Sequence, residues 1–489
     1  MNDKEASDSG DFVLYWMISF RRADYNFSLQ RAVNWAQQLK KPLVILEALR
    51  TDYPWASERL HRFVIEGMAD NANCFEKRPV YYYPYLETEQ GAGKGLFKAL
   101  ASRACVVVSD HFPCFFLPRM LKAASRQTSV RLEVVDSNGL LPMQAAEKVF
   151  ARAFDFRRFL QKNLLPHLAE LPKKNPLSRI KLPVLKELPA EIAKRWPQAN
   201  PADLLANSEY LSSLPIDHAV QQVRTLGGSV AAQKTMREFL REKLSIYDSD
   251  RNQPEHEATS GLSPYLHFGH ISAHRVFEEI TSLERWTPDK IEAKSTGSSS
   301  GWWGTSPAAE SFLDELITWR ELGYNMCWQR ADYDQYESLP DWARQTLAEH
   351  ASDPRGYVYS LEEFELAKTH NQLWNAAQQQ LVREGRIHNY LRMLWGKKIL
   401  EWSASPRDAL NTMIELNNKY ALDGRNPNSY SGIFWVLGRY DRAWGPERPV
   451  FGKIRYMSSA NTARKVRVKQ YIEKYTSNDN DKQRQLSPD

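Results

Sequence analysis

The stretch FVLYWMISFRRADYNFSLQRAVNWAQQLKKPLVIL, residues 12–46, decides the fold of the first part of the chain. It opens with the apolar run Phe12–Met17, which is typical of a strand buried on both faces. Residues 28–41 then carry apolar side chains at helical spacing, and residues 42–46 form a second short apolar run. A strand, a helix and another strand in this order predict a right-handed βαβ unit with parallel strands.

The same alternation continues outward from this unit. A helix is predicted over residues 57–73, and three more strands over residues 80–83, 105–108 and 130–135. Residues 1–145 are therefore predicted to form an α/β doubly wound N-terminal domain with a parallel five-stranded sheet. The chain lacks both G-x-G-x-x-G and a Walker A sequence, so the usual dinucleotide and triphosphate sites are absent. Any ligand of this domain would lie at the carboxyl ends of its strands, and the sequence does not identify it.

After this domain the pattern changes twice. Residues 146–215 are predicted to be a connector, because the prolines that crowd residues 163–215 prevent long helices. Residues 216–475 are predicted to be almost wholly helical, and the fold class is thus an α/β domain followed by a large all-α domain. The polar tail, residues 476–489, is predicted to be disordered.

The clearest helices of the second part have recognisable ends. They are predicted over residues 307–327, 361–384 and 386–402. Ser306 is the expected N-cap of the first, and Gly385 the expected C-cap of the second. The Ser- and Gly-rich residues 294–301 are expected to form a loop.

Composition excludes several classes of protein. With 489 residues, 42 % of them apolar and 25 % charged, the chain has the composition of a globular protein of two or three domains. No run approaches the roughly 18 apolar residues that cross a bilayer, and the polar N-terminus is not a secretory signal. The four cysteines show no C-x-x-C spacing, which argues against a zinc site or a disulfide framework. We therefore expect a cytoplasmic protein without a membrane partner.

Tryptophan and positive charge are unevenly distributed. Eleven of the 15 tryptophans lie between Trp286 and Trp444. Residues 390–474 contain 16 Lys or Arg against 7 Asp or Glu, an excess larger than the +6 of the whole chain. A basic, tryptophan-rich region is typical of a nucleic-acid binder, but a large helical core with a solvated basic face has the same composition. Composition alone leaves both interpretations open.

Two segments of the helical part contain candidate ligand-binding residues. Residues 257–272 (EATSGLSPYLHFGHIS) place Thr259, Ser260 and Ser263 ahead of a helix, as a phosphate site or simply an N-cap would. In residues 312–324, Glu315 and Trp319 are four apart and share a helix face. They could bind a flat polar ligand together. Alternatively, Glu315 is solvated and Trp319 is a core residue.

Two further segments pair an arginine with an acid. Arg392, Trp395, Ile399 and Trp402 recur on one helical face. An arginine on such a face needs a carboxylate partner or access to water, because an unpaired buried charge costs several kcal/mol. Asp423, in residues 416–435, is the natural candidate for that partner, and a basic run follows it.

Six motifs, in a fixed order, resemble one known family. They are SPYLHFGHIS (263–272), ELITWRE (315–321), LWNAAQ (373–378), LRM (391–393), KKILEW (397–402) and FGKIRYM (451–457). Together they are similar to the photolyase/cryptochrome family, and most similar to the class II cyclobutane pyrimidine dimer (CPD) DNA photolyases. The resemblance is strong in residues 240–475 and looser before them.

The resemblance implies that the helical domain binds FAD. The ribityl and pyrophosphate portion would be held by Tyr247 and by the stretch Thr259, Ser260, Gly261, Leu262 and Ser263. Arg392 and Asp423 match the family's ion pair beside the isoalloxazine, and Asn417 matches the residue that faces flavin N5. Asn389 also matches a residue near FAD, although many class II sequences have Gly there.

The resemblance also implies light-driven repair of CPD lesions in UV-damaged DNA by a lyase. The reduced flavin, excited by light, would donate an electron to a dimer flipped out of the helix. Trp319 and Trp435 would be the walls around the dimer, Glu315 would hydrogen-bond a pyrimidine edge, and Met393 would pack beneath it. DNA contacts are implied for three basic residues, namely Arg455, Arg439 and Lys453.

Trp374, Trp395 and Trp402 match the family's electron path that reduces the resting flavin, and Tyr359 extends it. The alternative for each tryptophan alone is a place in the core of a helix pair. His267, His270, His370 and His388 share no single ligand spacing, so we expect structural histidines and no metal.

Several functional alternatives remain at this stage. A cryptochrome-like blue-light sensor would keep FAD and the tryptophans, and a (6-4) photolyase would act on a different lesion. The first domain is a candidate site for an antenna chromophore, a folate or a deazaflavin. No obligate protein partner is expected, and the enzyme is expected to act as a monomer.

Overall fold

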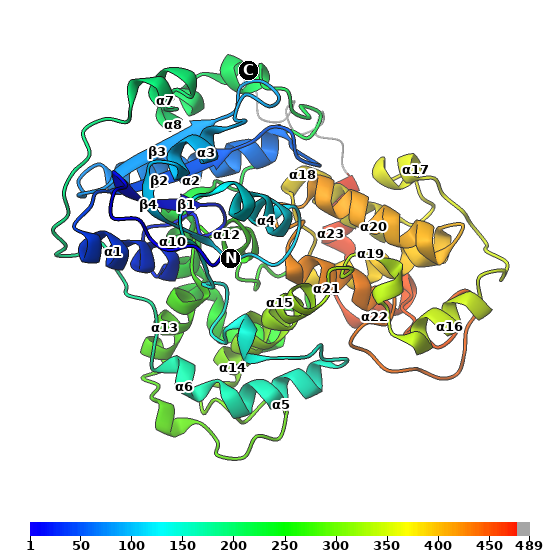
Figure 1. Ribbon diagram of the computed structural model, residues 1–489. Coiled ribbons are helices and arrows are strands. Elements are labelled where there is room, and N and C mark those ends of the chain that lie inside the picture. The colour runs from blue at the N-terminus through cyan, green and yellow to red at the C-terminus, as the bar shows by residue number, and fades with distance from the viewer. Residues whose placement is uncertain (477–489) are drawn as a thin grey trace, which may run out of the picture.

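Within residues 1–476, which the computed structural model describes, five parallel strands form the centre of the N-terminal part (Figure 1). Their order in the sheet is β3-β2-β1-β4-β5. The predicted doubly wound sheet is confirmed, and the point at which its strand order reverses lies between β1 and β4. The strands are β1 (Phe12–Met17), β2 (Leu43–Leu49), β3 (Tyr81–Leu86), β4 (Ala104–Asp110) and β5 (Leu132–Val135).

Helices cover both faces of the sheet, so successive residues of β1 enter different cores. Val13, Tyr15 and Met17 pack with residues of α1, while Leu14 and Trp16 pack with residues of α3 and α4. All of these side chains are buried, as expected for a central parallel strand. The helices are α1 (Phe27–Leu39), α2 (Glu58–Phe75), α3 (Leu96–Ala101) and α4 (Leu117–Gln127).

Residues 146–215 pack partly against the helical part of the molecule and partly against the sheet. The apolar face of α5 (Ala153–Asn163) joins the core of the helical part, whereas Ile192 of α7 and Trp196 join the core beneath the sheet. The remaining helices of this region are short, in agreement with its proline content. They are α6 (Leu165–Leu168), α7 (Ala190–Arg195), α8 (Pro201–Ala206) and α9 (Ser208–Ser212).

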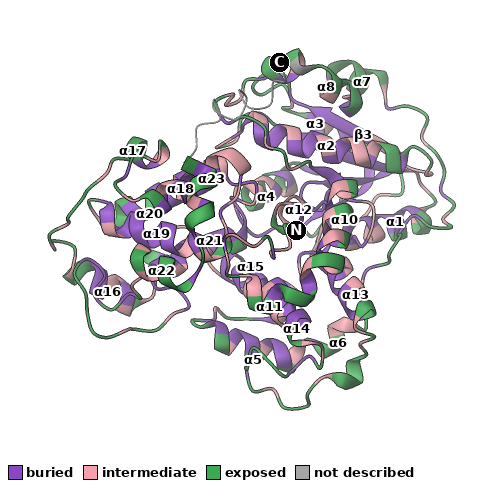
Figure 2. Ribbon diagram, turned by 180° about the vertical axis from the view of Figure 1, so that it is seen from behind, coloured by how far each residue is buried: buried purple, intermediate pink, exposed green. Residues whose placement is uncertain are grey.

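The rest of the described chain is helical and shares one large apolar core (Figures 1 and 2). No helix in residues 1–476 is long and apolar enough to cross a membrane. The α-helices are α10 (Gly228–Glu238), α11 (Tyr247–Asp250), α12 (Ser263–Phe268), α13 (Ala273–Leu283), α14 (Pro307–Leu313), α15 (Arg320–Gln329), α16 (Asp341–Glu349), α17 (Leu361–Glu365), α18 (Gln372–Glu384), α19 (Asn389–Trp402), α20 (Pro406–Tyr420), α21 (Pro427–Val436), α22 (Ser459–Lys465) and α23 (Lys469–Thr476). Two π-helical segments, η2 (Phe239–Lys243) and η5 (Asp314–Trp319), and four short 3₁₀ turns complete the set.

Two of the predicted helices differ from the structure. The helix predicted over residues 361–384 is wrong: it is two helices, α17 and α18, because Ala367 adopts φ 54° and Asn371 caps a new helix. The helix predicted over residues 307–327 is interrupted by the π-helical segment η5. The ends were predicted well, since Ser306 accepts from the Ala309 amide and Gly385 is a left-handed C-cap. The predicted tail, residues 476–489, lies outside the described residues except for Thr476.

The segment between α12 and α13 joins the two parts of the molecule. Gly269 has φ +75°, and a Cβ there would lie 1.9 Å from the Ser19 carbonyl oxygen. The Arg22 guanidinium donates to the Gly269 carbonyl (3.0 Å), and the Gly228 amide donates to His270 Nδ1 (2.9 Å). Only a glycine permits this close approach of the two backbones. The sheet is thereby attached directly to the helices that follow.

Candidate functional site

A cavity of about 510 Å³ lies in the helical part, within the range of cofactor sites. It is bordered by α10, by α11, by the residues before α12, and by the facing ends of α18 and α19. Eight of the residues implied to bind FAD are brought together here, although they are up to 176 positions apart. They are Tyr247, Thr259, Ser260, Gly261, Ser263, Asn389, Arg392 and Asp423.

An ion pair lies in the wall of the cavity. Arg392 Nη2 is 3.3 Å from Asp423 Oδ1, and the Ser263 hydroxyl donates to Asp423 Oδ2 at 2.6 Å. Burial alone would raise the pKa of Asp423, but Arg392 and the Ser263 hydroxyl outweigh it and hold that pKa below its usual value. The carboxylate therefore stays charged, and the expected pairing of Arg392 with Asp423 is present.

The residues ahead of α12 form a polar strip along one side of the cavity. Thr259, Ser260, Gly261 and Ser263 line it, and Gly261 has φ +68°. Leu262 does not line it: this side chain is 1 % exposed and belongs to the apolar core. Its implied role in cofactor binding is therefore limited to its backbone.

A second ion pair borders the cavity and was not predicted. Arg251 of the segment after α11 pairs with Glu315 of η5, and its guanidinium carbon lies 5.6 Å from the Tyr247 ring centroid. Burial raises the pKa of Glu315 and raises that of Tyr247 to about 12. Glu315 was expected to bind a pyrimidine edge, and in the structure Arg251 is its partner. Because α11 and η5 are distant in sequence, no local pattern indicated this pair.

Further basic residues and one histidine complete the cavity wall. Arg224, Lys234 and Arg386 line it, and Arg386 pairs with Glu257 and Glu384. Both ring nitrogens of His388 are buried and have no hydrogen-bond partner among the described residues. Burial lowers its pKa to about 4, so the imidazole is neutral and has unused hydrogen-bonding capacity beside the cavity. A large polar ligand in the cavity would satisfy this hydrogen-bonding capacity.

Arg386 and His388 lie close to Arg392 at the start of α19, so helix position could have drawn attention to them. Asn417 is different, because it is buried and does not appear among the residues that line the cavity. Its amide donates to Ser429 Oγ at 2.7 Å, which joins α20 to α21. The Asn417 side chain therefore lies at the junction of α20 and α21 and not in the wall of this cavity.

The three tryptophans of the implied electron path form one cluster between α18 and α19. Trp374 Nε1 donates to the Trp395 carbonyl (3.0 Å), and the rings of Trp374 and Trp402 are 6.1 Å apart. Tyr359 continues the cluster, with its ring 5.9 Å from that of Trp402. The tryptophans are all buried and Tyr359 is half-buried, so the cluster runs from the interior towards the surface.

Trp319 and Trp435 lie side by side. Their rings stack at 5.1 Å with an interplanar angle of 26°, which joins η5 to α21. Both are half-buried, and Met393 of α19 is half-buried as well. The two indoles therefore present a joint aromatic surface, and they do not face each other across an open gap.

The basic residues expected to contact DNA have different environments. Arg455 and Lys453 are exposed, and Arg455 lies 5.0 Å from the Trp444 ring. Arg439 is 2 % exposed, donates to the Tyr333 carbonyl (2.8 Å) and to Ser338 Oγ, and packs on Phe434. The prediction that Arg439 contacts DNA is wrong, because its guanidinium is enclosed by the protein.

The histidines hold no metal cluster in the described part of the chain, where no group of three or more His, Cys, Asp or Glu side chains is arranged for one. Burial lowers the pKa of His267 and of His270 to about 3, so both are neutral imidazoles. His370 is exposed and hydrogen-bonded to Tyr359. All four cysteines are free thiols.

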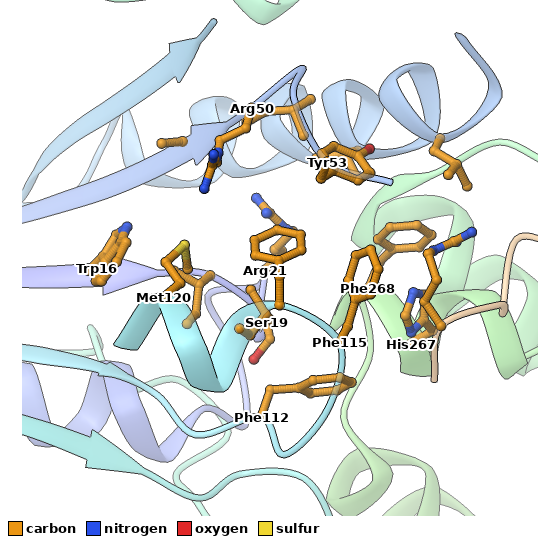
Figure 3. Close-up of a pocket in the computed structure, with 18 residues that line it drawn as sticks. Trp16, Ser19, Arg21, Arg50, Tyr53, Phe112, Phe115, Met120, His267 and Phe268 are labelled. Carbon is orange, nitrogen blue, oxygen red and sulfur yellow. The ribbon is translucent and has the colours of Figure 1, made fainter. Parts of the chain in front are cut away.

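Two adjoining cavities lie at the carboxyl ends of the strands. The larger has a volume of about 580 Å³, and the smaller one about 150 Å³. Trp16, Arg50 and Met120 line both of them, and His267 and Phe268 of α12 close the smaller one on its far side (Figure 3). This is the edge where the topology places ligands of a doubly wound sheet. The larger cavity also has charged groups, which are Asp52, Glu87, Lys94 and Arg119.

The chain is similar over almost its entire length to known DNA-repair enzymes. It is 33 % identical to the deoxyribodipyrimidine photo-lyase of Methanothermobacter thermautotrophicus over 477 residues, which are 97 % of this chain and 96 % of the archaeal one. It is 34 % identical to the enzyme of that name from Arabidopsis thaliana over 94 % of this chain and 88 % of the plant protein. No family model matches the chain.

Solved structures have the same fold at low sequence identity. A bacterial class III photolyase from Agrobacterium tumefaciens superposes with a TM-score of 0.66 at 16 % identity, over 97 % of this chain and 87 % of the other. A cryptochrome from Synechocystis sp. PCC6803 superposes with a TM-score of 0.64 at 14 % identity, over 95 % and 88 %. Both matches concern the fold, which repair enzymes and cryptochromes share.

Proposed function

This chain belongs to the deoxyribodipyrimidine photo-lyase family and repairs pyrimidine dimers in DNA, and we propose that the cavity between α12, α18 and α19 holds its FAD. The observation that carries the proposal is the Arg392–Asp423 ion pair, which segments 31 positions apart bring to the wall of a cofactor-sized cavity. Bound FAD, when reduced and excited by light, supplies one electron to the dimer and takes it back after the cyclobutane ring opens.

The residues of the cavity wall have distinct proposed tasks. Thr259 and Ser260 offer hydroxyl and amide donors to the pyrophosphate, Ser263 offers its amide because its hydroxyl donates to Asp423, and Arg386 offers positive charge nearby. Tyr247 covers one side of the cavity, with its hydroxyl kept protonated by burial. Arg392 and Asp423 present a donor and an acceptor of fixed orientation to the flavin ring. Asn389 borders the same end of the cavity.

The dimer is proposed to bind on the joint aromatic surface of Trp319 and Trp435, with Met393 beside it. A flipped dimer loses its stacking in the duplex, at a cost of a few kcal/mol, and an indole surface replaces part of that stacking. Glu315 lies on the same element as Trp319 and would bind a pyrimidine edge once Arg251 releases it or shares it. Asn417 is proposed to act through the α20–α21 junction beside this pocket.

DNA outside the lesion is proposed to contact the exposed basic residues. Arg455 and Lys453 lie on the loop between α21 and α22, and both side chains reach solvent. Contacts of this kind to phosphates make affinity fall as salt rises.

The buried tryptophans are proposed to carry electrons between the surface and the cavity. The rings of Trp374 and Trp402 are in contact, Tyr359 extends them outward, and Trp395 joins them through the hydrogen bond from the Trp374 indole to its carbonyl. The contact of Trp374 with Trp402 and of Trp402 with Tyr359 suits stepwise electron transfer. Exposed residues at the outer end would then receive electrons from a reductant in solution.

The two cavities at the edge of the sheet are proposed to hold the antenna chromophore. Their combined space, with aromatic walls from Trp16 and Phe116, suits a flat folate or deazaflavin. Arg50 and Arg119 are available for an acidic side group of either chromophore.

Photorepair by the FAD-loaded enzyme tests the function. An oligonucleotide with one thymine dimer is illuminated with blue light and the reduced enzyme, and restored thymines are quantified by chromatography. We expect repair in the light and binding without repair in darkness. Binding without repair under light would contradict the lyase and favour a cryptochrome-like sensor. Repair of a (6-4) photoproduct instead of the dimer would move the enzyme to the other lesion class.

A further inference from the structure

Tyr359 and His370 form a hydrogen-bonded pair at the outer end of the tryptophan cluster. Tyr359 precedes α17 and His370 follows it, so the short helix brings the two side chains together. The Tyr359 amide donates to the Trp402 carbonyl (3.0 Å), and the His370 ring lies 4.8 Å from that of Trp402. Both side chains therefore contact the last tryptophan of the cluster.

The hydrogen bonds of the phenol have a defined direction. The His370 backbone amide donates to the Tyr359 hydroxyl oxygen (3.0 Å), and that hydroxyl is 2.7 Å from His370 Nδ1. In the neutral imidazole with its hydrogen on Nε2, Nδ1 is an acceptor, and the Tyr359 hydroxyl then donates its hydrogen to it. Tyr357 stacks on the imidazole at 3.8 Å and 18°, which holds the ring in place.

Neighbouring charges favour a neutral His370. Burial and the Lys398 ammonium lower the pKa of His370, while Glu401 acts in the opposite direction. Lys398 pairs with Glu401, and its ammonium lies 5.4 Å from the centre of the Trp402 ring. A positive charge at that distance disfavours a second positive charge on Trp402, and so it favours passing oxidation on to Tyr359.

We propose that His370 is the proton acceptor for Tyr359 when this tyrosine is oxidised at the end of the electron path. The proposal rests on the electron path of the proposed function. Trp402, having lost one electron towards a light-excited oxidised flavin, takes one electron from Tyr359. The phenolic O–H bond breaks at the same time, and its proton bonds to His370 Nδ1. The products are a neutral tyrosyl radical, an imidazolium and a restored Trp402, so charge and atoms balance.

This proton transfer prolongs the lifetime of the charge-separated state, in which the flavin has gained an electron and Tyr359 has lost one. A phenol that loses an electron without losing its proton is a very strong acid, so a base in hydrogen-bond contact removes a large energetic barrier. Once the proton is on an exposed imidazole, solvent can take it up, and return of the electron to Tyr359 becomes slow. The half-buried tyrosyl radical then has time to react with an external reductant such as a thiol.

The test is flash photolysis of the FAD-loaded enzyme with its flavin oxidised. Tryptophan and tyrosine radicals are distinguished by transient absorption and electron paramagnetic resonance. In His370→Gln we expect tyrosyl formation to slow by about 100-fold or more and the tryptophan radical to live longer, since the amide cannot take the proton. His167→Gln, at a half-buried histidine on α6, is the control and should behave as the unchanged enzyme.

The pH profile adds a readout that a structural role would not alter. In the unchanged enzyme the tyrosyl yield should fall as pH drops below the pKa of His370, which is lower than about 6.5, because the imidazolium cannot accept a proton. In His370→Gln the yield should stay low and flat with pH. In the dark, ¹⁵N resonances of histidine should show Nδ1 unprotonated, and Tyr359→Phe should raise the pKa of His370.

The outcomes separate the two proposals. A tyrosyl radical formed in His370→Gln at the unchanged rate and with the unchanged pH profile would overturn the role of His370 and leave the electron path intact. Absence of a tyrosyl radical in the unchanged enzyme would overturn the role of His370. Persistence of that radical in Trp402→Phe would overturn the electron path, and His370 with it.

Discussion

Arg392 and Asp423 show how much one ion pair can contribute to a cofactor site. The carboxylate is largely enclosed, and Arg392 and the Ser263 hydroxyl are the main groups that keep its pKa low. If the arginine is removed, the carboxylate is left with a desolvation cost and no compensating charge. Removal of Arg392 should therefore affect cofactor binding before it affects any catalytic step.

Arg392→Ala is expected to weaken FAD binding by about 100-fold or more, since breaking a buried ion pair costs about 3–5 kcal/mol. The measurement is the flavin-to-protein absorbance ratio after exhaustive dialysis, together with the Kd of the apoprotein for FAD. Arg330→Ala removes the exposed pair of Arg330 with Asp332 and serves as the control. Full flavin occupancy in Arg392→Ala would show that the pair does not support the cofactor.

Two arginines near each other in sequence are expected to respond differently to substitution. Arg455→Ala should weaken DNA binding and lower the salt dependence of log Kd by about one unit, as the loss of one phosphate contact does. Arg439→Ala should leave that slope unchanged but reduce the free energy of unfolding by about 2–3 kcal/mol, because buried hydrogen bonds of a charged group are lost. Fluorescence anisotropy over a salt series and urea unfolding measure the two effects. A reduced salt slope in Arg439→Ala would restore it as a DNA contact.

Helices α18 and α19 hold the electron path as a pair. Trp374 lies on α18 and Trp395 and Trp402 on α19, so the cluster exists only because these two helices pack together. The Trp395 indole donates to Gln378 Oε1 (2.9 Å), which fixes its orientation across the interface. The pair thus sets both the position and the tilt of the rings.

Trp395→Phe is expected to abolish light-driven reduction of the resting flavin while sparing repair by enzyme that has been reduced chemically. A phenyl ring is far harder to oxidise than an indole, so the path is interrupted without emptying the space. Flavin absorbance under blue light measures the reduction, and dimer repair by dithionite-reduced enzyme measures the remainder. Trp303→Phe changes a buried tryptophan of the segment before α14 and should affect neither. Undiminished photoreduction would remove Trp395 from the path.

At the scale of the whole molecule, buried histidines make the free energy of unfolding depend on pH. His61, His270 and His274 are buried, and burial lowers their pKa values to about 4, 3 and 3. In the unfolded chain a histidine takes up a proton near pH 6.5, while these three stay neutral in the folded state. Stability from this source is therefore complete above about pH 6.5 and is lost as pH falls towards the folded pKa values.

Acidification from pH 6.5 to 4.5 is expected to reduce the free energy of unfolding steeply, by about 1.4 kcal/mol per pH unit for each of these three histidines and for His267 and His388, whose pKa values burial also lowers. Urea unfolding at a series of pH values measures the slope. His270→Gln should reduce this slope by the share of one histidine, about 1.4 kcal/mol per pH unit, because a glutamine can accept from the Gly228 amide but does not titrate. His350→Gln is the control, since its hydrogen bond to Asp353 raises the pKa of His350 and gives it no part in this slope. A slope unchanged by His270→Gln would contradict this account.

The strands, the parallel sheet and the pairing of Arg392 with Asp423 could be predicted because each depends on a strong local rule. A central parallel strand is apolar throughout, and an arginine on a buried helix face is expected to find a carboxylate partner or to reach water. The six motifs indicated the family, and the resemblance to that family indicated the eight residues that the fold brings together around the cavity. These features are encoded within short stretches of residues.

Tertiary structure alone decided the remaining features. The enclosure of Arg439, the Arg251–Glu315 pair and the stacking of Trp319 on Trp435 each arise from contacts between distant segments. The break between α17 and α18 is local, at Ala367 and Asn371, but the helical spacing of the sequence did not indicate it. The Tyr359–His370 pair belongs with them, since a helix break has to bring the two side chains together. A local sequence pattern records what a residue can do, whereas the partner and the burial of that residue are properties of the packed chain.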